Sequence, residues 1–318
     1  MIHAGVFRPA FLISLGAARL SFVQRKVNAI SRVCASDGCF YVLRIYPPQA
    51  DPEAIAGEIH WLMAMRRTTD LLVPEPVPTA HRALIVTLAA PSVLEPHHGV
   101  LLSWLPGRFR SPEYVSMRQL AHVGATIAAL HVHAAQYVPA TPLHRQRWDA
   151  DRIVGRSETF AETMLAHEWL GADDRDLLTA SVAQVRVALD ALGSDAATWG
   201  LIHAGLHPWN MVWQRGRVGV FDFDDCGAGH YLFDLAVALA NWSDSGAQTG
   251  RYQAILTGYT HVRPLLPRDE RLLPTLMQGR ACRSIIGWLQ RTPPGIAPSA
   301  YIRGLLAQLR RLASVNGD

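Results

Sequence analysis

Alternating apolar and polar positions over the first hundred residues predict a small antiparallel sheet. Stretches 22–33 and 40–46 are rich in β-branched and aromatic residues, and the Asp37-Gly38 dipeptide between them is a strong hairpin signal. Within the second stretch, Leu43 points to one face of the strand and Arg44 to the other. Two further strands are expected at 83–88 and 100–104.

A helix is expected after the second strand, because Asp51 suits the N-cap of a helix and Pro52 suits its first position. The apolar stripe of this helix contains Ile55, Ile59 and Leu62. Glu58 falls on the same stripe, which is an unusual position for a solvent-exposed charged residue.

The pattern becomes mainly helical after Leu105-Pro106-Gly107, which predicts a boundary between two parts, 1–106 and 107–318. In the second part, Ser111-Pro112-Glu113 predicts the start of a long helix, and another helix is expected over 173–192. Short strands follow, two of them joined by an Arg215-Gly216 turn, at 201–203, 211–213 and 218–221. From 231 onward, helices should alternate with loops. This order predicts an α+β protein with two unequal lobes.

Composition narrows the class of protein. The 318 residues are 49% hydrophobic and 18% charged, which excludes a disordered or collagen-like chain. No run of about 18 uncharged apolar residues is present, so no membrane-spanning helix is expected. The short apolar start is interrupted by Pro9, so no signal peptide is expected either. The four cysteines are scattered without a Cys-x-x-Cys pair and predict free thiols in a reducing, cytoplasmic location.

The positive charge is carried almost entirely by arginine. A net charge of +4 suits an anionic ligand, but the basic residues form no runs, so no nucleic-acid partner is expected. Lys26 is the single lysine of the chain. Any phosphate-binding role that needs a basic side chain therefore falls on Lys26 or passes to an arginine.

The segment from His203 to Asn210, followed by a hairpin and Asp222, carries the candidate chemistry. An Asn and an Asp on either side of a short hairpin can converge on one cation, and Mg²⁺ prefers such oxygen ligands. A kinase catalytic loop has the same layout: a His, a base Asp two residues later, an Asn five residues after that, then an Asp-Phe-Gly-like turn. Asn210 and Asp222 fit the metal positions, and Gly205 stands where the base should be.

Residues 201–235 resemble the signature of the aminoglycoside phosphotransferase and choline kinase-like family of small-molecule kinases, and Asp234-Leu235-Ala236 matches its last element. Strand 41–45 resembles the one that carries the phosphate-binding basic residue, here Arg44, and Glu58 matches the helix Glu that pairs with it. Residues 101–107 resemble the hinge between the lobes. The resemblance implies a two-lobed protein kinase-like fold, with a nucleotide-binding lobe followed by a larger catalytic and substrate lobe.

The resemblance also implies a reaction and its cofactors. The expected activity is phosphoryl transfer from ATP, with Mg²⁺ held by Asn210 and Asp222, to a hydroxyl group of a small molecule. Arg44 would contact the phosphates, and the hinge backbone at Ser103, Trp104 and Leu105 would meet adenine.

Gly205 is the main departure from the family pattern, because it removes the carboxylate that would accept the hydroxyl proton. Three interpretations of this glycine remain open. The chain is an impaired kinase, or a pseudokinase that only binds nucleotide or a partner, or an ordinary kinase whose native aspartate was substituted. A fourth alternative is a metal hydrolase that uses His203, His207 and Asp222, but Pro208 argues against a shared helix face. A missing base costs about 10²–10⁴-fold in rate, so an impaired kinase is the leading hypothesis.

Several polar residues around the motif have simpler structural interpretations. His203 is expected to brace the loop by hydrogen bonding rather than to act as a base, and Asp234 to anchor the loop. His131 is expected to be structural. Asp224 and Asp225 fit a second metal ligand or a turn cap equally well. The mixture of arginine and acidic residues over 145–176 disfavours a strongly cationic substrate, and Trp148 and Trp209 are either an aromatic wall or core.

Overall fold

The computed structural model describes residues 19–25, 27–88, 95–140, 142–156, 162–242 and 250–315. The apolar start of the chain and Lys26 lie outside the described residues. The chain forms two compact units, neither of which is a single run of sequence. The first unit consists of Met1–Arg108, Tyr137–Arg145 and Gly219–Asp224, and the second of Phe109–Gln136, Gln146–Val218 and Asp225–Asp318.

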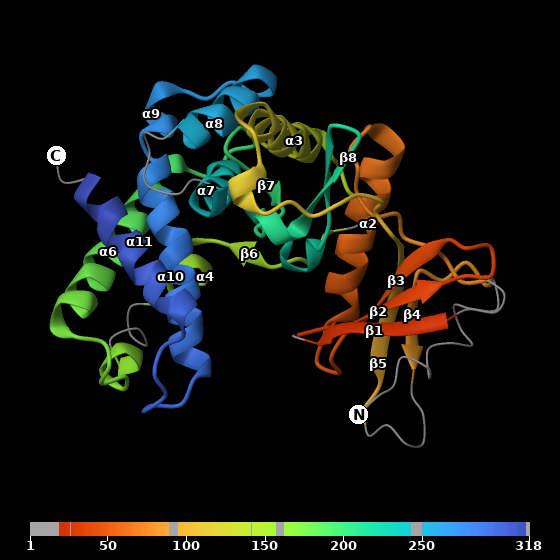
Figure 1. Ribbon diagram of the computed structural model, residues 1–318, viewed down its shortest axis with the longest axis horizontal. Helices are drawn as coiled ribbons and strands as arrows, with labels where there is room; N and C mark the ends of the chain where they lie inside the picture. The colour runs from red at the N-terminus through yellow and green to blue at the C-terminus, as the bar shows by residue number, and fades with distance from the viewer. Residues whose placement is uncertain are drawn as a thin grey trace. The chain divides into compact units, whose positions relative to one another are not determined.

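The first unit contains a five-stranded sheet in the order β1-β2-β3-β5-β4, in which all neighbouring strands run antiparallel (Figure 1). Its core is formed by Val33, Leu43, Ile45 and Leu101. The strands are β1 (Arg19–Arg25), β2 (Ala29–Cys34), β3 (Phe40–Ile45), β4 (Ile85–Leu88) and β5 (His97–Ser103).

The strand-like stretch 22–33 contains the end of β1 and most of β2, so the sheet begins earlier in the chain than expected. The stretch has no Gly or Pro to separate the two strands, so its β-branched and aromatic residues look continuous. The predicted hairpin at Asp37-Gly38 is confirmed: Gly38 adopts a φ of 83°, and Asp37 Oδ1 accepts a hydrogen bond from the Cys39 N–H at 2.8 Å.

Helix α2 (Pro52–Thr68) begins as predicted. The Asp51 side chain accepts a hydrogen bond from the Glu53 N–H, and Pro52 occupies the first turn, where its missing N–H costs nothing. The predicted stripe is buried, and Glu58 is buried with it. A charged residue on the core face of α2 therefore needs a partner inside the unit.

The second unit is mainly helical, as predicted. The helices are α3 (Met117–Gln136), α4 (Ala150–Val154), α6 (Ala172–Leu192), α7 (Tyr231–Trp242), α8 (Gly250–Val262), α9 (Pro267–Glu270), α10 (Leu273–Arg291) and α11 (Ala300–Val315) (Figure 1). None of the helices in the described ranges is both long and apolar enough to span a membrane.

The start of the first long helix differs from the prediction. Pro112–Tyr114 forms only a 3₁₀ turn, and Ser111 makes no capping hydrogen bond with its side chain. Helix α3 starts five residues later, because Ser116 and Gln119 form a capping box: the Gln119 N–H donates to Ser116 Oγ, and the Ser116 N–H donates to Gln119 Oε1.

A three-stranded sheet in the order β6-β10-β7 and a two-stranded hairpin complete the described elements. β10 was not predicted, because its sequence Gly-Ala-Gly-His lacks strand-forming side chains. The Arg215-Gly216 turn is confirmed, with φ values of 47° and 81° that are typical of a type I′ turn. The strands are β6 (Arg147–Trp148), β7 (Trp199–Ile202), β8 (Met211–Gln214), β9 (Arg217–Val220) and β10 (Gly227–His230).

Candidate active site

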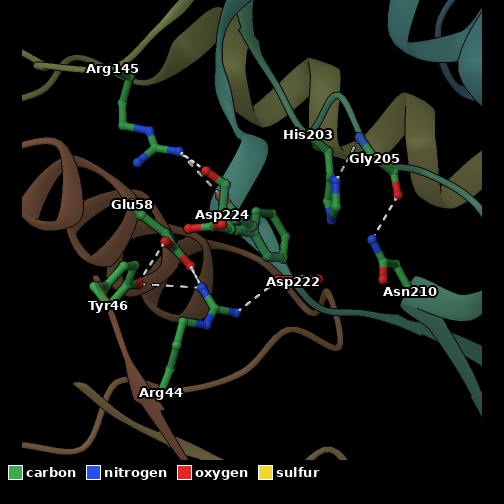
Figure 2. Close-up of polar contacts among 10 residues, drawn as sticks. Arg44, Tyr46, Glu58, Arg145, His203, Gly205, Asn210, Asp222 and Asp224 are labelled. Atoms are coloured by element: carbon green, nitrogen blue, oxygen red, sulfur yellow. Dashed lines mark hydrogen bonds and ion pairs between the residues drawn. The ribbon is translucent and has the colours of Figure 1, made fainter. Parts of the chain in front are cut away.

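A buried ion pair between β3 and α2 is the central feature of the first unit. Arg44 Nη1 donates to Glu58 Oε1 at 2.7 Å, and the Tyr46 hydroxyl donates to Glu58 Oε2 at 3.1 Å (Figure 2). Arg44 is 4% exposed and Glu58 is 0% exposed, so neither residue is a solvated surface charge. The structure thus brings together the two residues that the resemblance pairs, and it adds Tyr46, which the sequence analysis did not single out.

The charge of Arg44 is stabilised by its surroundings. Burial alone would lower the pKa of Arg44, but the nearby charge of Glu58, with smaller contributions from Tyr46 and Asp222, raises that pKa well above its usual value. Arg44 therefore remains a cation inside the unit. Its Nε is buried and has no hydrogen-bond partner among the described residues, so the guanidinium retains a donor for a ligand.

Asp222 is the second acid that Arg44 contacts. Arg44 Nη2 lies 3.1 Å from Asp222 Oδ1, and 43% of the Asp222 side chain remains exposed to solvent. Asp222 adopts a φ of 65°, in the left-handed region that residues other than glycine seldom occupy. Strain of this kind is found most often at functional sites, and Asp tolerates it better than most residues.

Arg145 holds the turn after Asp222 against α2. Its guanidinium donates to the carbonyl oxygens of Asp224 and Phe223 (Figure 2). It also donates to the Ala54 carbonyl at 2.8 Å. The Phe223 ring packs edge-on against Trp61, with ring centroids 5.5 Å apart. Contacts to backbone carbonyls leave no trace in the sequence, so this role of Arg145 could not be predicted from it.

The predicted hinge residues continue from the end of β5. The Ser103 N–H donates to the Glu75 carbonyl at 2.8 Å, and the Trp104 N–H donates to the Phe40 carbonyl at 3.1 Å. Two of the backbone donors in this segment are therefore already used within the unit. Leu105 follows directly, with its side chain half-buried.

The loop after β7 in the second unit is anchored by Asp234, as predicted. Its carboxylate accepts hydrogen bonds from the His203 N–H at 2.9 Å and the Ala204 N–H at 2.8 Å. His131 lies 3.2 Å from the same carboxylate and contacts the Tyr259 hydroxyl on its other ring nitrogen. Burial lowers the pKa of His131, although its hydrogen bond to Asp234 opposes the shift. The predicted structural roles of Asp234 and His131 are confirmed.

Gly205 is held by the residues on both sides of it. Its N–H donates to His203 Nδ1 at 3.2 Å, and its carbonyl accepts a hydrogen bond from Asn210 Nδ2 at 3.0 Å (Figure 2). His203 is completely buried and braces the loop. The left-handed position belongs to Ala204, with a φ of 61°, and not to Gly205.

A side chain at position 205 would meet little resistance. A Cβ there would lie 3.3 Å from Asn210 Nδ2 and 3.4 Å from His203 Nδ1, so these two side chains would have to shift by a few tenths of an ångström. The two candidate aromatic walls differ: Trp148 is 3% exposed and belongs to the core, whereas Trp209 is 64% exposed. No group of three or more His, Cys, Asp or Glu side chains within the described ranges could hold a metal ion.

Comparison with known proteins shows the family to which the chain belongs. The model of the phosphotransferase enzyme family matches residues 29–270. A homoserine kinase of Granulibacter bethesdensis is 28% identical over 287 residues, which cover 86% of this chain and 82% of that protein. A homoserine kinase of Gluconacetobacter diazotrophicus is 28% identical over 281 residues, covering 84% and 79%.

Two solved structures share the fold. The structure of a microcompartment-associated aminopropanol kinase has a TM-score of 0.78 at 24% identity and covers 96% of this chain and 97% of its own. That of amicoumacin kinase hAmiN, in complex with AMP-PNP, Ca²⁺ and Ami, has a TM-score of 0.77 at 21% identity and covers 96% and 90%. These likenesses confirm the expected protein kinase-like α+β fold.

Proposed function

Because the chain belongs to the phosphotransferase enzyme family, we propose that it transfers the γ-phosphoryl group of ATP to a hydroxyl group of a small molecule, and that Gly205 slows this transfer. The observation that carries the proposal is the buried Arg44–Glu58 pair with Asp222 beside it. Burying a cation is costly unless it is paired, and the pairing here leaves one donor of the guanidinium unused.

Arg44 is proposed to bind the phosphates of the nucleotide. Glu58 and Tyr46 fix its guanidinium, so little conformational freedom is lost when a phosphate oxygen meets it. At the hinge, the Ser103 and Trp104 N–H groups already donate within the unit. The Trp104 carbonyl and the Leu105 N–H are therefore the proposed partners of the adenine ring.

Asp222 and Asn210 are proposed to hold the divalent cation, which we take to be Mg²⁺. A carboxylate oxygen and an amide oxygen are suitable ligands for this hard ion, and the exposed part of the Asp222 side chain keeps its carboxylate accessible. Asn210 donates to the Gly205 carbonyl through Nδ2, which leaves its amide oxygen for a metal. A bound cation would neutralise charge on the phosphates during transfer.

Gly205 is proposed to make the chain a slow enzyme. Without a carboxylate at this position, no side chain there accepts the proton of the attacking hydroxyl, and such a loss costs about 10²–10⁴-fold in rate. His203 does not replace it, because its Nδ1 already accepts from the Gly205 N–H. Positioning and charge neutralisation still act, so residual transfer is expected.

The proposed acceptor is an amino alcohol. Two curated relatives with broad coverage are named homoserine kinase, and a solved structure of the same fold is named aminopropanol kinase. Both names describe compounds with a hydroxyl group and an amine. A second candidate function is nucleotide binding without transfer, which the glycine at the base position favours.

Nucleotide binding is the first test of the proposal. Mg-ATP at 100 times its dissociation constant should stabilise the protein by about 2.7 kcal/mol, measured as a rise in melting temperature. Asp222→Asn should abolish the Mg²⁺-dependent part of this rise, because Asn keeps the left-handed backbone but loses the charge.

Asp225→Asn is the matched control, because its exposed side chain belongs to the second unit and its carbonyl contacts are kept. No rise with Mg-ATP in folded wild-type protein, or equal losses in the two variants, would contradict the proposed site.

A further inference from the structure

Four arginines of the second unit gather around Arg283, and we call them the arginine cluster: Arg152 of α4 and Arg280, Arg283 and Arg291 of α10. The guanidinium carbons of Arg152 and Arg283 lie 5.4 Å and 5.7 Å from the centre of the Trp148 ring. Two cations thus share one buried aromatic ring, which attracts each of them but does not neutralise either.

The arginine cluster holds more positive charge than its surroundings balance. Among the described residues, no Asp or Glu forms an ion pair with any of its four members, and Arg283 Nε is buried without a hydrogen-bond partner. Burial and the charges of the other three arginines lower the pKa of Arg283, and only Asp225 acts in the opposite direction. Arg283 therefore carries a positive charge that its surroundings oppose more than they support.

The guanidinium groups of Arg283 and Arg291 converge over Gly287. A Cβ on Gly287 would lie 2.9 Å from Arg283 Nη1 and 3.1 Å from Arg291 Nη1, so both groups use the space that this glycine leaves open. Like charges that are free in solvent separate rather than converge. Two converging forks of N–H donors form a binding geometry suited to a carboxylate or a phosphate.

The sheet that carries Trp148 also leads into the loop that contains Gly205. Trp148 belongs to β6, which pairs with β10, and β10 pairs with β7, whose last residue Ile202 precedes His203. The Trp148 indole N–H also donates to the Asp225 carbonyl at 2.8 Å. Side chains of Ile202 and Trp148 both lie within 3.0 Å of the position of a Cβ on Gly229.

We propose that the arginine cluster binds the anionic group of the acceptor molecule, so that the substrate is an amino alcohol that also carries a carboxylate. This inference rests on the proposed function and adds the charge of the substrate. A compact oxyanion would bridge Arg283 and Arg291, with Arg152 beside Trp148 completing the positive surroundings. The preference for a carboxylate comes from charge-assisted hydrogen bonds, which are about twice as strong as hydrogen bonds between neutral groups.

The test compares two compounds that differ only by a carboxylate, L-homoserine and 3-amino-1-propanol. Their binding is measured by calorimetry on the full chain. Homoserine should bind at least about 10-fold more tightly, because a hydrogen bond to a charged group corresponds to about 10–100-fold in affinity. Equal affinity, or no measurable binding of either compound, would overturn the inference.

Variants assign the preference to the cluster. Arg283→Gln and Arg291→Gln should each weaken homoserine binding about 10–100-fold and leave 3-amino-1-propanol unchanged. Arg311→Gln, an exposed arginine on α11, removes the same charge as a control and should change neither. Neither cluster variant should lower the melting temperature, because each removes repulsion. If Arg283→Gln does not fold, the effect of Arg291→Gln on homoserine binding decides the test, because Arg291 is exposed.

Inorganic phosphate distinguishes a substrate site from a site for free anions. Suppose that Arg283→Gln abolishes phosphate binding and yet leaves homoserine binding unchanged. That result would assign the cluster to free anions and overturn the inference. The melting shift with Mg-ATP is measured on the same samples. If that shift is present but homoserine shows no preference, only the acceptor inference fails; if it is absent in wild type, the proposed function fails.

Discussion

Arg44 depends on its neighbours to keep its charge inside the first unit. Its place on β3, opposite Leu43, is readable from the alternation of the strand, and Glu58 is readable from the stripe of α2. The contact between them could be predicted only through the family resemblance, because residues 14 positions apart meet through tertiary packing. Tyr46 and Arg145 had no such signal, since a hydroxyl and backbone carbonyls are common to many positions.

Glu58→Gln should lower the free energy of unfolding by about 3 kcal/mol, because it leaves the buried cation of Arg44 without its main counter-charge. Urea denaturation measures the change. Glu75→Gln, which removes a surface carboxylate paired with Arg66, should cost less than about 0.5 kcal/mol. Equal losses in the two variants would show that the Arg44–Glu58 pair does not bear on stability.

His230 should make stability depend on pH. Burial lowers the pKa of His230 to about 4, although the charge of Asp190 opposes the shift. The unfolded chain, with a histidine pKa near ~6.5, then takes up a proton first as the pH falls, so stability is present above pH ~6.5 and is lost toward pH 4.

Between pH 7 and pH 5, His230 should account for a loss of about 1–2 kcal/mol in the free energy of unfolding. His230→Gln should remove this part of the slope, while the parts due to His131 and His133, whose pKa values burial also lowers, remain. An unchanged slope in the variant would mean that His230 titrates alike in the folded and unfolded states.

At the scale of elements, local signals decided which predictions held. Helix α2 was predicted from its cap, because Asp51 and Pro52 act on the residues next to them. The start of α3 after Ser116 was missed, since its capping box competes with the stronger signal of Ser111-Pro112-Glu113. β10 forms because β6 and β7 supply partners on both sides, which its own sequence does not reveal.

The β8–β9 turn offers a prediction at this scale. Arg215 and Gly216 both have positive φ, and Asn-Gly suits such a type I′ turn better than Arg-Gly. Arg215→Asn should stabilise the protein by about 0.5–1 kcal/mol in urea denaturation. Gly216→Ala should destabilise it by about 1–2 kcal/mol through backbone strain alone, because no atom lies within 4 Å of its Cβ position. The same sign for both changes would refute the turn assignment.

At the scale of the whole molecule, the chain folds into two units made of discontinuous segments. Residues Gly219–Asp224 belong to the first unit, where the Val220 N–H donates to the Leu72 carbonyl at 2.9 Å. Asp222 therefore folds with Arg44 and Glu58, while Gly205 and Asn210 fold with Asp234 in the second unit. The order of motifs predicted the residues of the candidate site. The unit to which each residue belongs depends on contacts between residues more than a hundred positions apart, such as Arg44 and Asp222.

The most direct test of the account is phosphoryl transfer by Gly205→Asp. Transfer of labelled phosphate from ATP to homoserine and to 3-amino-1-propanol is measured for wild type, Gly205→Asp and the uncharged control Gly205→Asn. Because the backbone at 205 is not left-handed and a Cβ meets only side-chain atoms, both variants should fold, as melting curves will check.

The account predicts that Gly205→Asp transfers about 10²–10⁴-fold faster than wild type, whereas Gly205→Asn gains nothing, since only a carboxylate accepts the proton of the attacking hydroxyl. A folded Gly205→Asp protein that binds Mg-ATP but is no faster than wild type on either acceptor would contradict the account. The chain would then be a nucleotide-binding member of its family rather than a slowed kinase.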